Sequence, residues 1–203
     1  MFSMKVLLLN GGAKCRGATQ TILETICGVL PRGWEADMAR LGELNLHFCK
    51  GCKVCYKTCA CVQEDDVQAL LARMDEADVL ILAVPSYWGD VPAQLKAFID
   101  RCTPYANTNP NPAHKTLRPE KKCFGIALRA GTRPGECQHI IEAIAHWCGH
   151  MGVEMVDSTY FCQIDVEQDI SPHKQKIRET AEQWFSTMTK SVLKEERESE
   201  GVS

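Results

Sequence analysis

The feature that most constrains the fold of this chain is a regular alternation of strand-like and helix-like segments. Apolar runs typical of strands occupy five stretches, at 5–10, 34–41, 78–85, 122–130 and 153–161. Segments with apolar residues at helical spacing follow them, at 19–30, 65–77, 91–102, 134–152 and about 172–194. Strands that are each followed by a helix predict a parallel sheet covered by helices on both faces.

The chain length favours one domain of this kind. Its 203 residues can bury a sizeable core, so we expect a single domain over residues 1–195 and a frayed polar tail over 196–203. The pattern fits any three-layer α/β domain. At this length it favours the flavodoxin-like arrangement, a five-stranded parallel sheet with the order 2-1-3-4-5.

Charge and cysteine content limit the partners. The net charge is −3 and there is no long basic run, which argues against nucleic acid or an anionic membrane as the main partner. No apolar stretch is long enough to cross a bilayer, and the start lacks the features of a signal peptide. We therefore expect a cytoplasmic protein. In that reducing compartment the twelve cysteines indicate thiol, metal or cluster chemistry rather than a disulfide scaffold.

The loop after the first strand, NGGAKCRGAT at 10–19, has the composition of a phosphate-binding turn. Its glycines allow close approach to a ligand, and the next helix presents free N–H groups. The spacing from Gly12 to Gly17 resembles an ATPase phosphate loop, but Ala18 stands where that loop has lysine. The dinucleotide fingerprint GxGxxG is also absent. Two interpretations of the loop remain. It binds a single phosphate through backbone amides and Thr19, with Lys14 or Arg16 as further partners, or it is a plain strand-to-helix turn.

Four segments together resemble the group of NADPH-dependent flavin mononucleotide (FMN) reductases and iron–sulfur flavoproteins. They are GGAKCRGAT (11–19), CKGCKVCYKTCACVQEDD (49–66), AVPSYWGDVPAQLKAFIDR (83–101) and RAGTRPGE (129–136). In the first segment, Gly12 replaces the usual serine, Ala13 the proline and Lys14 the arginine. The resemblance implies the flavodoxin-like fold and an oxidoreductase that binds FMN.

The resemblance also implies where FMN binds. The expected cofactor-binding residues come from three loops: Gly11, Gly12, Lys14, Arg16, Gly17, Ala18, Thr19, Pro85, Ser86, Tyr87, Trp88, Gly89, Arg129, Ala130, Gly131 and Gly135. Tyr87 and Trp88 would offer flat apolar faces to the flavin ring, although Trp88 could instead cover the core or fill an interface. Arg129 would lie near the pyrimidine edge, or be a solvated surface charge like Arg133. No protein residue is assigned a catalytic role, because the flavin carries the redox step.

The stretch HFCKGCKVCYKTCACVQEDD (47–66) concentrates five cysteines. The resemblance implies a four-iron–four-sulfur (4Fe–4S) cluster bound by Cys49, Cys52, Cys55 and Cys61. Cys59 is the alternative fourth ligand, at ferredoxin-like spacing but without the following proline. Zinc, redox-active thiols and unligated thiols are competing interpretations. We interpret Asp65 and Asp66 as helix caps rather than ligands.

The remaining expectations concern partners. Electrons would come from NAD(P)H, ferredoxin or an internal cluster and pass to an acceptor, which can be a small molecule. A homodimer or homotetramer is expected, with 103–120 and Trp88 as contact regions. Asp100 and Arg101 favour ion pairs or an interface, and His146 and His150 favour a surface or interface role over metal binding. The alternative function is a flavin-free module that senses metal or redox state through the cysteine-rich loop.

Overall fold

A computed structural model describes residues 3–200, with side chains up to Lys190. Its centre is a five-stranded, all-parallel sheet in the order β2-β1-β3-β4-β5. The strands are β1 (Lys5–Asn10), β2 (Glu35–Arg40), β3 (Val79–Pro85), β4 (Lys122–Leu128) and β5 (Glu154–Phe161). The predicted flavodoxin-like strand order is therefore confirmed.

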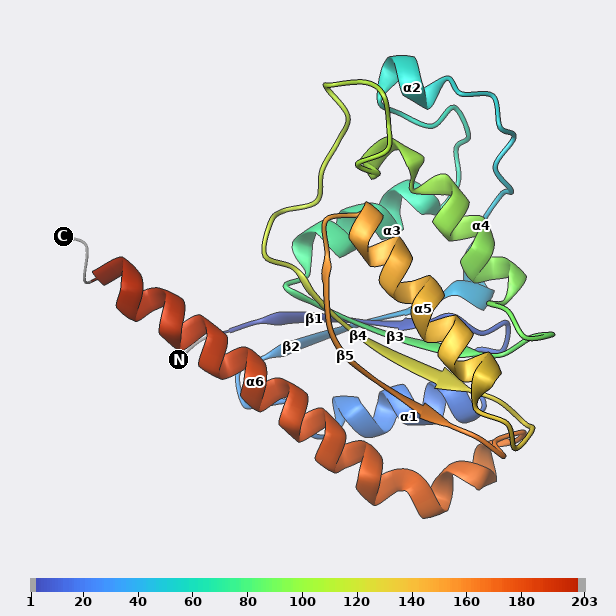
Figure 1. Ribbon diagram of the computed structural model, residues 1–203, viewed down its shortest axis with the longest axis vertical. Coiled ribbons are helices and arrows are strands. Elements are labelled where there is room, and N and C mark those ends of the chain that lie inside the picture. The colour runs from blue at the N-terminus through green and yellow to red at the C-terminus, as the bar shows by residue number, and fades with distance from the viewer. Residues whose placement is uncertain (1–2, 201–203) are drawn as a thin grey trace.

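Helices cover both faces of the sheet (Figure 1). On one face lie α1 (Ala18–Cys27) and α6 (Lys174–Glu200), and on the other α3 (Val67–Glu76), α4 (Ala93–Arg101) and α5 (Gly135–His150). The short α2 (Cys55–Thr58) lies within the cysteine-rich loop. Three 3₁₀ turns complete the chain: η1 (Leu41–Glu43), η2 (Thr103–Tyr105) and η3 (Glu167–His173).

Side-chain alternation along β1 explains why the sheet has two cores. Leu7 and Leu9 belong to the core beneath α3, α4 and α5, whereas Val6 and Leu8 belong to the core beneath α1 and α6. Successive side chains of a strand point to opposite faces, so a strand that is apolar throughout requires cover on both. On the second face, Trp184 of α6 stacks on Phe124 of β4 with ring centroids 4.7 Å apart.

Two details differ from the sequence-based expectations. The final helix continues to Glu200 instead of ending near residue 194, and residues 201–203 lie outside the described residues. Asp66 occupies the N-cap position of α3 without capping it, because its carboxylate accepts a hydrogen bond from the Asn45 amide at 2.7 Å. Asp65 instead accepts the Val67 amide at 3.2 Å. The division into one domain over 1–195 and a frayed tail stays a prediction.

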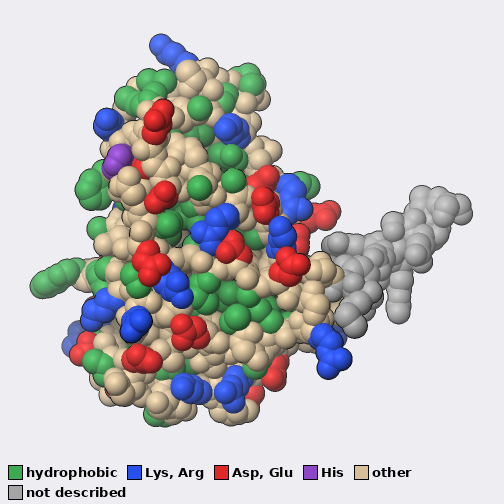
Figure 2. All heavy atoms as spheres, turned by 180° about the vertical axis from the view of Figure 1, so that it is seen from behind, with side chains coloured by type: hydrophobic (Ala, Val, Ile, Leu, Met, Phe, Trp, Pro, Cys, Tyr) green, Lys and Arg blue, Asp and Glu red, His purple; other side chains and the backbone are tan. Residues whose placement is uncertain are grey.

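The surface carries charges of both signs. Figure 2 shows Lys and Arg side chains interspersed with Asp and Glu side chains on the face opposite the view of Figure 1. Among the helices that the structure describes, none combines the length and the apolar character needed to cross a membrane.

Candidate functional site

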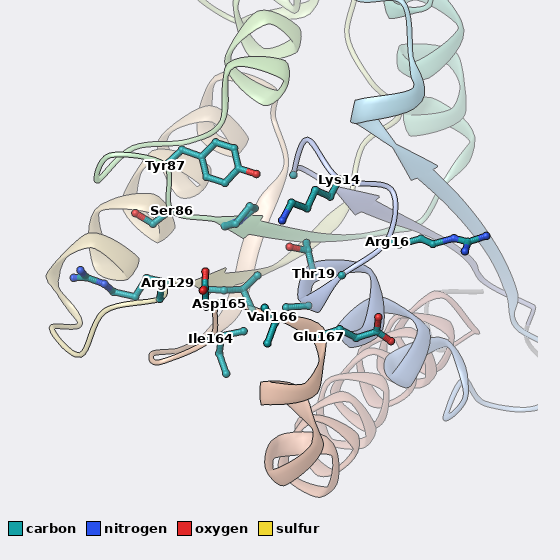
Figure 3. Close-up of a pocket in the computed structure, with 16 residues that line it drawn as sticks. Lys14, Arg16, Thr19, Ser86, Tyr87, Arg129, Ile164, Asp165, Val166 and Glu167 are labelled. Carbon is teal, nitrogen blue, oxygen red and sulfur yellow. The ribbon is translucent and has the colours of Figure 1, made fainter.

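A cleft of about 350 Å³ opens at the carboxyl ends of β1, β3 and β4 (Figure 3). Parallel α/β sheets bind ligands at this edge, where the strand order reverses. Most of the predicted cofactor-binding residues line the cleft: Gly12, Lys14, Arg16, Gly17, Ala18, Thr19, Pro85, Ser86, Tyr87, Arg129 and Ala130. Gly11, Trp88, Gly89, Gly131 and Gly135 do not line it.

A buried asparagine shapes the loop after β1. Asn10 is fully buried, and its amide nitrogen donates to Gln20 Oε1 at 3.1 Å and to the Lys14 carbonyl at 3.3 Å. Its Oδ1 accepts the Gly12 amide at 3.0 Å. Gly11 donates to the Ala83 carbonyl of β3 at 2.8 Å. The loop is thus fastened before any ligand binds, which lowers the ordering cost of binding.

The start of α1 faces this cleft with no side-chain cap. Gly17 precedes the helix with φ 129° and ψ −168°, a backbone conformation that essentially only glycine adopts. The first helical turn contains no acidic residue. Its N–H groups lack intrahelical partners and carry the positive end of the helix dipole. In Figure 3 the Lys14 amine and the Thr19 hydroxyl point into the cleft, whereas Arg16 points away from it. This end of the cleft therefore favours an anion.

The loop after β3 begins in the cleft and then leaves it. The Ser86 amide donates to the Leu128 carbonyl, and its hydroxyl donates to Glu136 Oε2, both at 2.7 Å. Tyr87 pairs with Asp90 across a tight turn in which Trp88 (φ 55°) and Gly89 (φ 80°) have positive φ. That geometry is a type I′ hairpin turn. It places Trp88 at the tip, where its side chain is fully exposed and outside the cleft.

The arginine expected at the flavin ring is held by the protein itself. Arg129 forms an ion pair with Glu136 at 3.1 Å and donates to the Arg133 carbonyl at 2.5 Å. Its guanidinium lies so close to Gly131 that a Cβ there would be 2.3 Å from Nη2. Within the part of the chain that the structure describes, the buried Arg129 Nε–H has no hydrogen-bond partner. The terminal nitrogens of the Arg129 guanidinium are therefore bound to Glu136 and to the Arg133 carbonyl.

The cleft has a fourth wall that no sequence motif indicated. Ile164, Asp165, Val166 and Glu167, which follow β5, also line it. The Asp169 carboxylate holds this segment by accepting the Asp165 amide at 2.8 Å and the Val166 amide at 3.0 Å. These two hydrogen bonds lower the pKa of Asp169. The available signal was position alone, since the segment follows the carboxyl end of the fifth strand.

The four predicted ligands all lie on the cysteine-rich loop, between residues 49 and 61. The pKa of Cys55 is raised, first by burial and then by the charges of Cys61, Cys49 and Cys52. All the cysteines of the loop are free thiols. Within residues 3–200, no group of three or more His, Cys, Asp or Glu side chains is arranged to hold a single metal ion. Each cysteine of a 4Fe–4S cluster binds a different iron, so a cluster does not need that tighter arrangement.

Comparison with known proteins identifies the family. The family model for NADPH-dependent FMN reductases matches residues 4–162. The chain belongs to this FMN reductase family. An iron–sulfur flavoprotein of Archaeoglobus fulgidus is 37% identical over 137 residues, which cover 67% of this chain and 64% of that protein. An iron–sulfur flavoprotein of Methanosarcina thermophila is 30% identical over 164 residues, 78% and 80% of the two chains.

The sequence matches cover only part of the first relatives, and the structural match has low sequence identity. The chain spans between 48% and 64% of the length of the first curated relatives that it matches. An FMN-dependent NADH-azoreductase from Bacillus anthracis, solved in complex with FMN, superposes with a TM-score of 0.63 at 12% identity. That match covers 89% of this chain and 99% of the other. At such low identity it supports the fold that this FMN reductase family member adopts.

Two further predicted groups lie outside the cleft of this family member. Asp100 pairs with Lys96 and Arg101 with Asp65, so both form the expected ion pairs. His146 and His150 lie on α5 with their Nε2 atoms 3.0 Å apart. They line a second cavity of about 530 Å³ together with Cys49, Cys102 and Trp147. His150 Nδ1 lies 3.2 Å from Asn107 Oδ1, so the pair is already engaged with the protein.

Proposed function

We propose that this chain is an FMN-dependent oxidoreductase that binds the flavin phosphate at the start of α1 and the ring between the loops after β3 and β4. One observation carries the proposal: the loops after β1, β3 and β4 converge on a single cleft at an uncapped helix start. The residues proposed to hold the cofactor are those predicted residues that line this cleft.

The protein's part in this function is binding and orientation. FMN, when bound, supplies the electron-transfer chemistry. Amides at the start of α1, Thr19 and Lys14 hold the phosphate, and Tyr87 offers an aromatic face to the flavin. Arg129, which lines the cleft, is the proposed partner for the flavin edge. NAD(P)H is the proposed donor, with ferredoxin as an alternative redox partner. The cluster proposed below is a further alternative as electron donor, and the acceptor is a small molecule.

A matched pair of threonine variants tests FMN binding. Thr19 lines the cleft, whereas Thr25 lies further along α1 and donates to the Thr21 carbonyl at 2.7 Å. A hydrogen bond to a charged phosphate contributes about 1.5–3 kcal/mol, so Thr19→Ala should weaken FMN binding by about tenfold or more. Thr25→Ala should leave FMN affinity unchanged. Fluorescence titration measures both. Failure of the wild-type protein to bind FMN in the micromolar range would refute the proposal.

We also propose that Cys49, Cys52, Cys55 and Cys61 bind a 4Fe–4S cluster. The description of the relatives as iron–sulfur flavoproteins supports the ligand set, and the electrostatic effect of the other three thiols on Cys55 is in keeping with it. Anaerobic purification followed by iron and sulfide analysis and EPR spectroscopy provides the test. Cys61→Ala should abolish cluster assembly and Cys59→Ala should preserve it; the reverse result would make Cys59 the ligand. Stoichiometric zinc without iron or flavin would instead favour the metal-sensing alternative.

The proposed assembly is a cytoplasmic homodimer or homotetramer. Trp88 is fully exposed at the tip of its hairpin, and tryptophan is enriched at protein interfaces. Size-exclusion chromatography with light scattering should therefore give a mass above 22.7 kDa. A monomer that binds FMN fully would contradict the proposed assembly without affecting the proposed cofactor.

A further inference from the structure

Arg101, the last residue of α4, lies buried beneath the cysteine-rich loop. Only 1% of its side chain is exposed. A guanidinium has five N–H donors, and those of Arg101 meet five acceptors. Nε donates to Cys61 Sγ at 3.2 Å; Nη1 donates to the His47 carbonyl at 2.9 Å and to Asp65 Oδ2 at 2.7 Å. Nη2 donates to the Gln63 carbonyl at 3.4 Å and to Asp65 Oδ1 at 3.1 Å.

These acceptors come from both ends of the loop. His47 precedes the first cysteine, whereas Cys61, Gln63 and Asp65 lie at the end of the cysteine cluster or follow it. Asp65 reinforces the closure because its Oδ2 also accepts the His47 amide at 2.9 Å. The Gln63 side-chain amide donates to the Phe48 carbonyl at 2.9 Å. Arg101 and its partners therefore join the entry and the exit of the cysteine-rich loop.

The charges of this arrangement are balanced within it. The Asp65 side chain is fully buried; burial opposes its ionisation, but hydrogen bonds from Arg101 and from the His47 and Val67 amides lower its pKa. A buried charge without a partner is strongly destabilising, so Arg101 and Asp65 depend on each other. The bond from Nε to sulfur is separate from this ion pair. Lysine could keep the charge, but it has no planar fork that reaches all four residues at once.

We propose that Arg101 is a positioning residue for the cysteine-rich loop. It closes the loop and holds Cys61 Sγ before iron and sulfide bind, and its Nε–H bond to that sulfur raises the reduction potential of the bound cluster. Hydrogen bonds to ligand sulfurs stabilise the more negative, reduced state of such clusters. This inference rests on the proposed cluster, although loop closure is a property of the cluster-free chain.

The first experiment uses cluster-free protein and follows hydrogen exchange of the amides over residues 47–67. In the wild type, the His47 and Val67 amides should be protected, because Asp65 accepts both. Arg101→Lys should speed exchange across the loop on the order of tenfold to a hundredfold, the effect of losing charged hydrogen bonds. Unprotected amides in the wild type, or unchanged exchange in the variant, would overturn the proposal. Unprotected wild-type amides would overturn loop closure even if the variant does not fold.

The second experiment separates the bond to sulfur from general stabilisation. Asp65→Asn removes the ion pair and keeps the Arg101 Nε–H, so it serves as the matched control. After anaerobic reconstitution, Arg101→Lys should incorporate less iron and sulfide, and its remaining cluster should have a lower midpoint potential. Asp65→Asn should loosen the loop without lowering that potential. Equal shifts in both variants, or none in either, would show that Arg101 acts only as a structural ion pair. If the wild type takes up no iron, the proposed cluster fails while hydrogen exchange still decides loop closure.

Discussion

Replacing Gly17 by alanine isolates the backbone conformation on which the phosphate end of the cleft depends. A Cβ at Gly17 would meet no atom within 4 Å, so the substitution adds no clash. Its cost is the strain of holding φ at 129°, about 1–3 kcal/mol for a residue with a Cβ. Alanine also makes the unfolded chain less flexible than glycine does, which stabilises the folded state by about 0.4–1 kcal/mol. The middle of these two ranges gives a net expected loss in the free energy of unfolding of about 1.3 kcal/mol.

Urea denaturation measures this loss, with Gly149→Ala as the control. Gly149 lies in α5, and a Cβ there also meets open space, but without a positive φ. Alanine in a helix is favoured over glycine by roughly 0.5–1 kcal/mol, so the control should gain stability. Gly17→Ala should also bind FMN more weakly, because relief of the strain moves the start of α1. A Gly17→Ala protein as stable as the wild type, or a control that loses stability equally, would refute the reasoning.

Three single substitutions test the hairpin tip, the segment after β5 and a buried lysine. Trp88→Gly should raise the free energy of unfolding of the monomer by about 0.5–1 kcal/mol, because glycine tolerates the left-handed conformation; a loss in urea denaturation would mean that Trp88 packs against a surface. Asp169→Asn should lower FMN affinity several-fold by loosening the segment after β5, and it should reduce the loss of stability as pH falls through the lowered pKa of Asp169. Burial lowers the pKa of Lys121 from 10.5 to about 8. Between pH 8 and 10.5 the unfolded chain therefore binds more protons than the folded protein, so Lys121 makes the melting temperature rise with pH across that range. Lys121→Met should remove this pH-dependent rise.

The features that follow from chain periodicity could be predicted. Strands apolar along their whole length require two covered faces, as β1 and β3 do. The alternation of strands and helices predicted the parallel sheet, and the chain length favoured its order. Because parallel strands end at one edge, the loops after β1, β3 and β4 were expected to meet there. They do so in the cleft. The position of these loops in the chain was sufficient to predict that they meet, because the sheet aligns the strands that precede them.

The features that depend on turn geometry or on distant partners could not be predicted. Trp88 was expected at the flavin ring, over the core or at an interface, and the sequence did not show that a type I′ turn places it at the tip of a hairpin. Arg129 meets Glu136 and Arg101 meets Asp65, and no local pattern in the sequence specifies which acid an arginine meets. The wall formed by Ile164 and its neighbours contains no residue type that is specific to phosphate or flavin. It reaches the cleft because η3 turns the chain back toward α1.

The proposed flavin site and the cysteine-rich loop are linked through one glycine. A Cβ at Gly42, in η1, would lie 2.2 Å from the Ala13 carbonyl oxygen, so the backbone entering the cysteine-rich loop packs directly against the loop after β1. Beside this contact, the pKa of Cys15 is raised by burial and by its hydrogen bond with Glu43, also in η1. Backbone packed this closely cannot shift on one side without displacing the other. The segment that leads into the proposed cluster and the loop that receives the proposed phosphate therefore form one unit, fastened to the sheet by Asn10 and closed at its far end by Arg101.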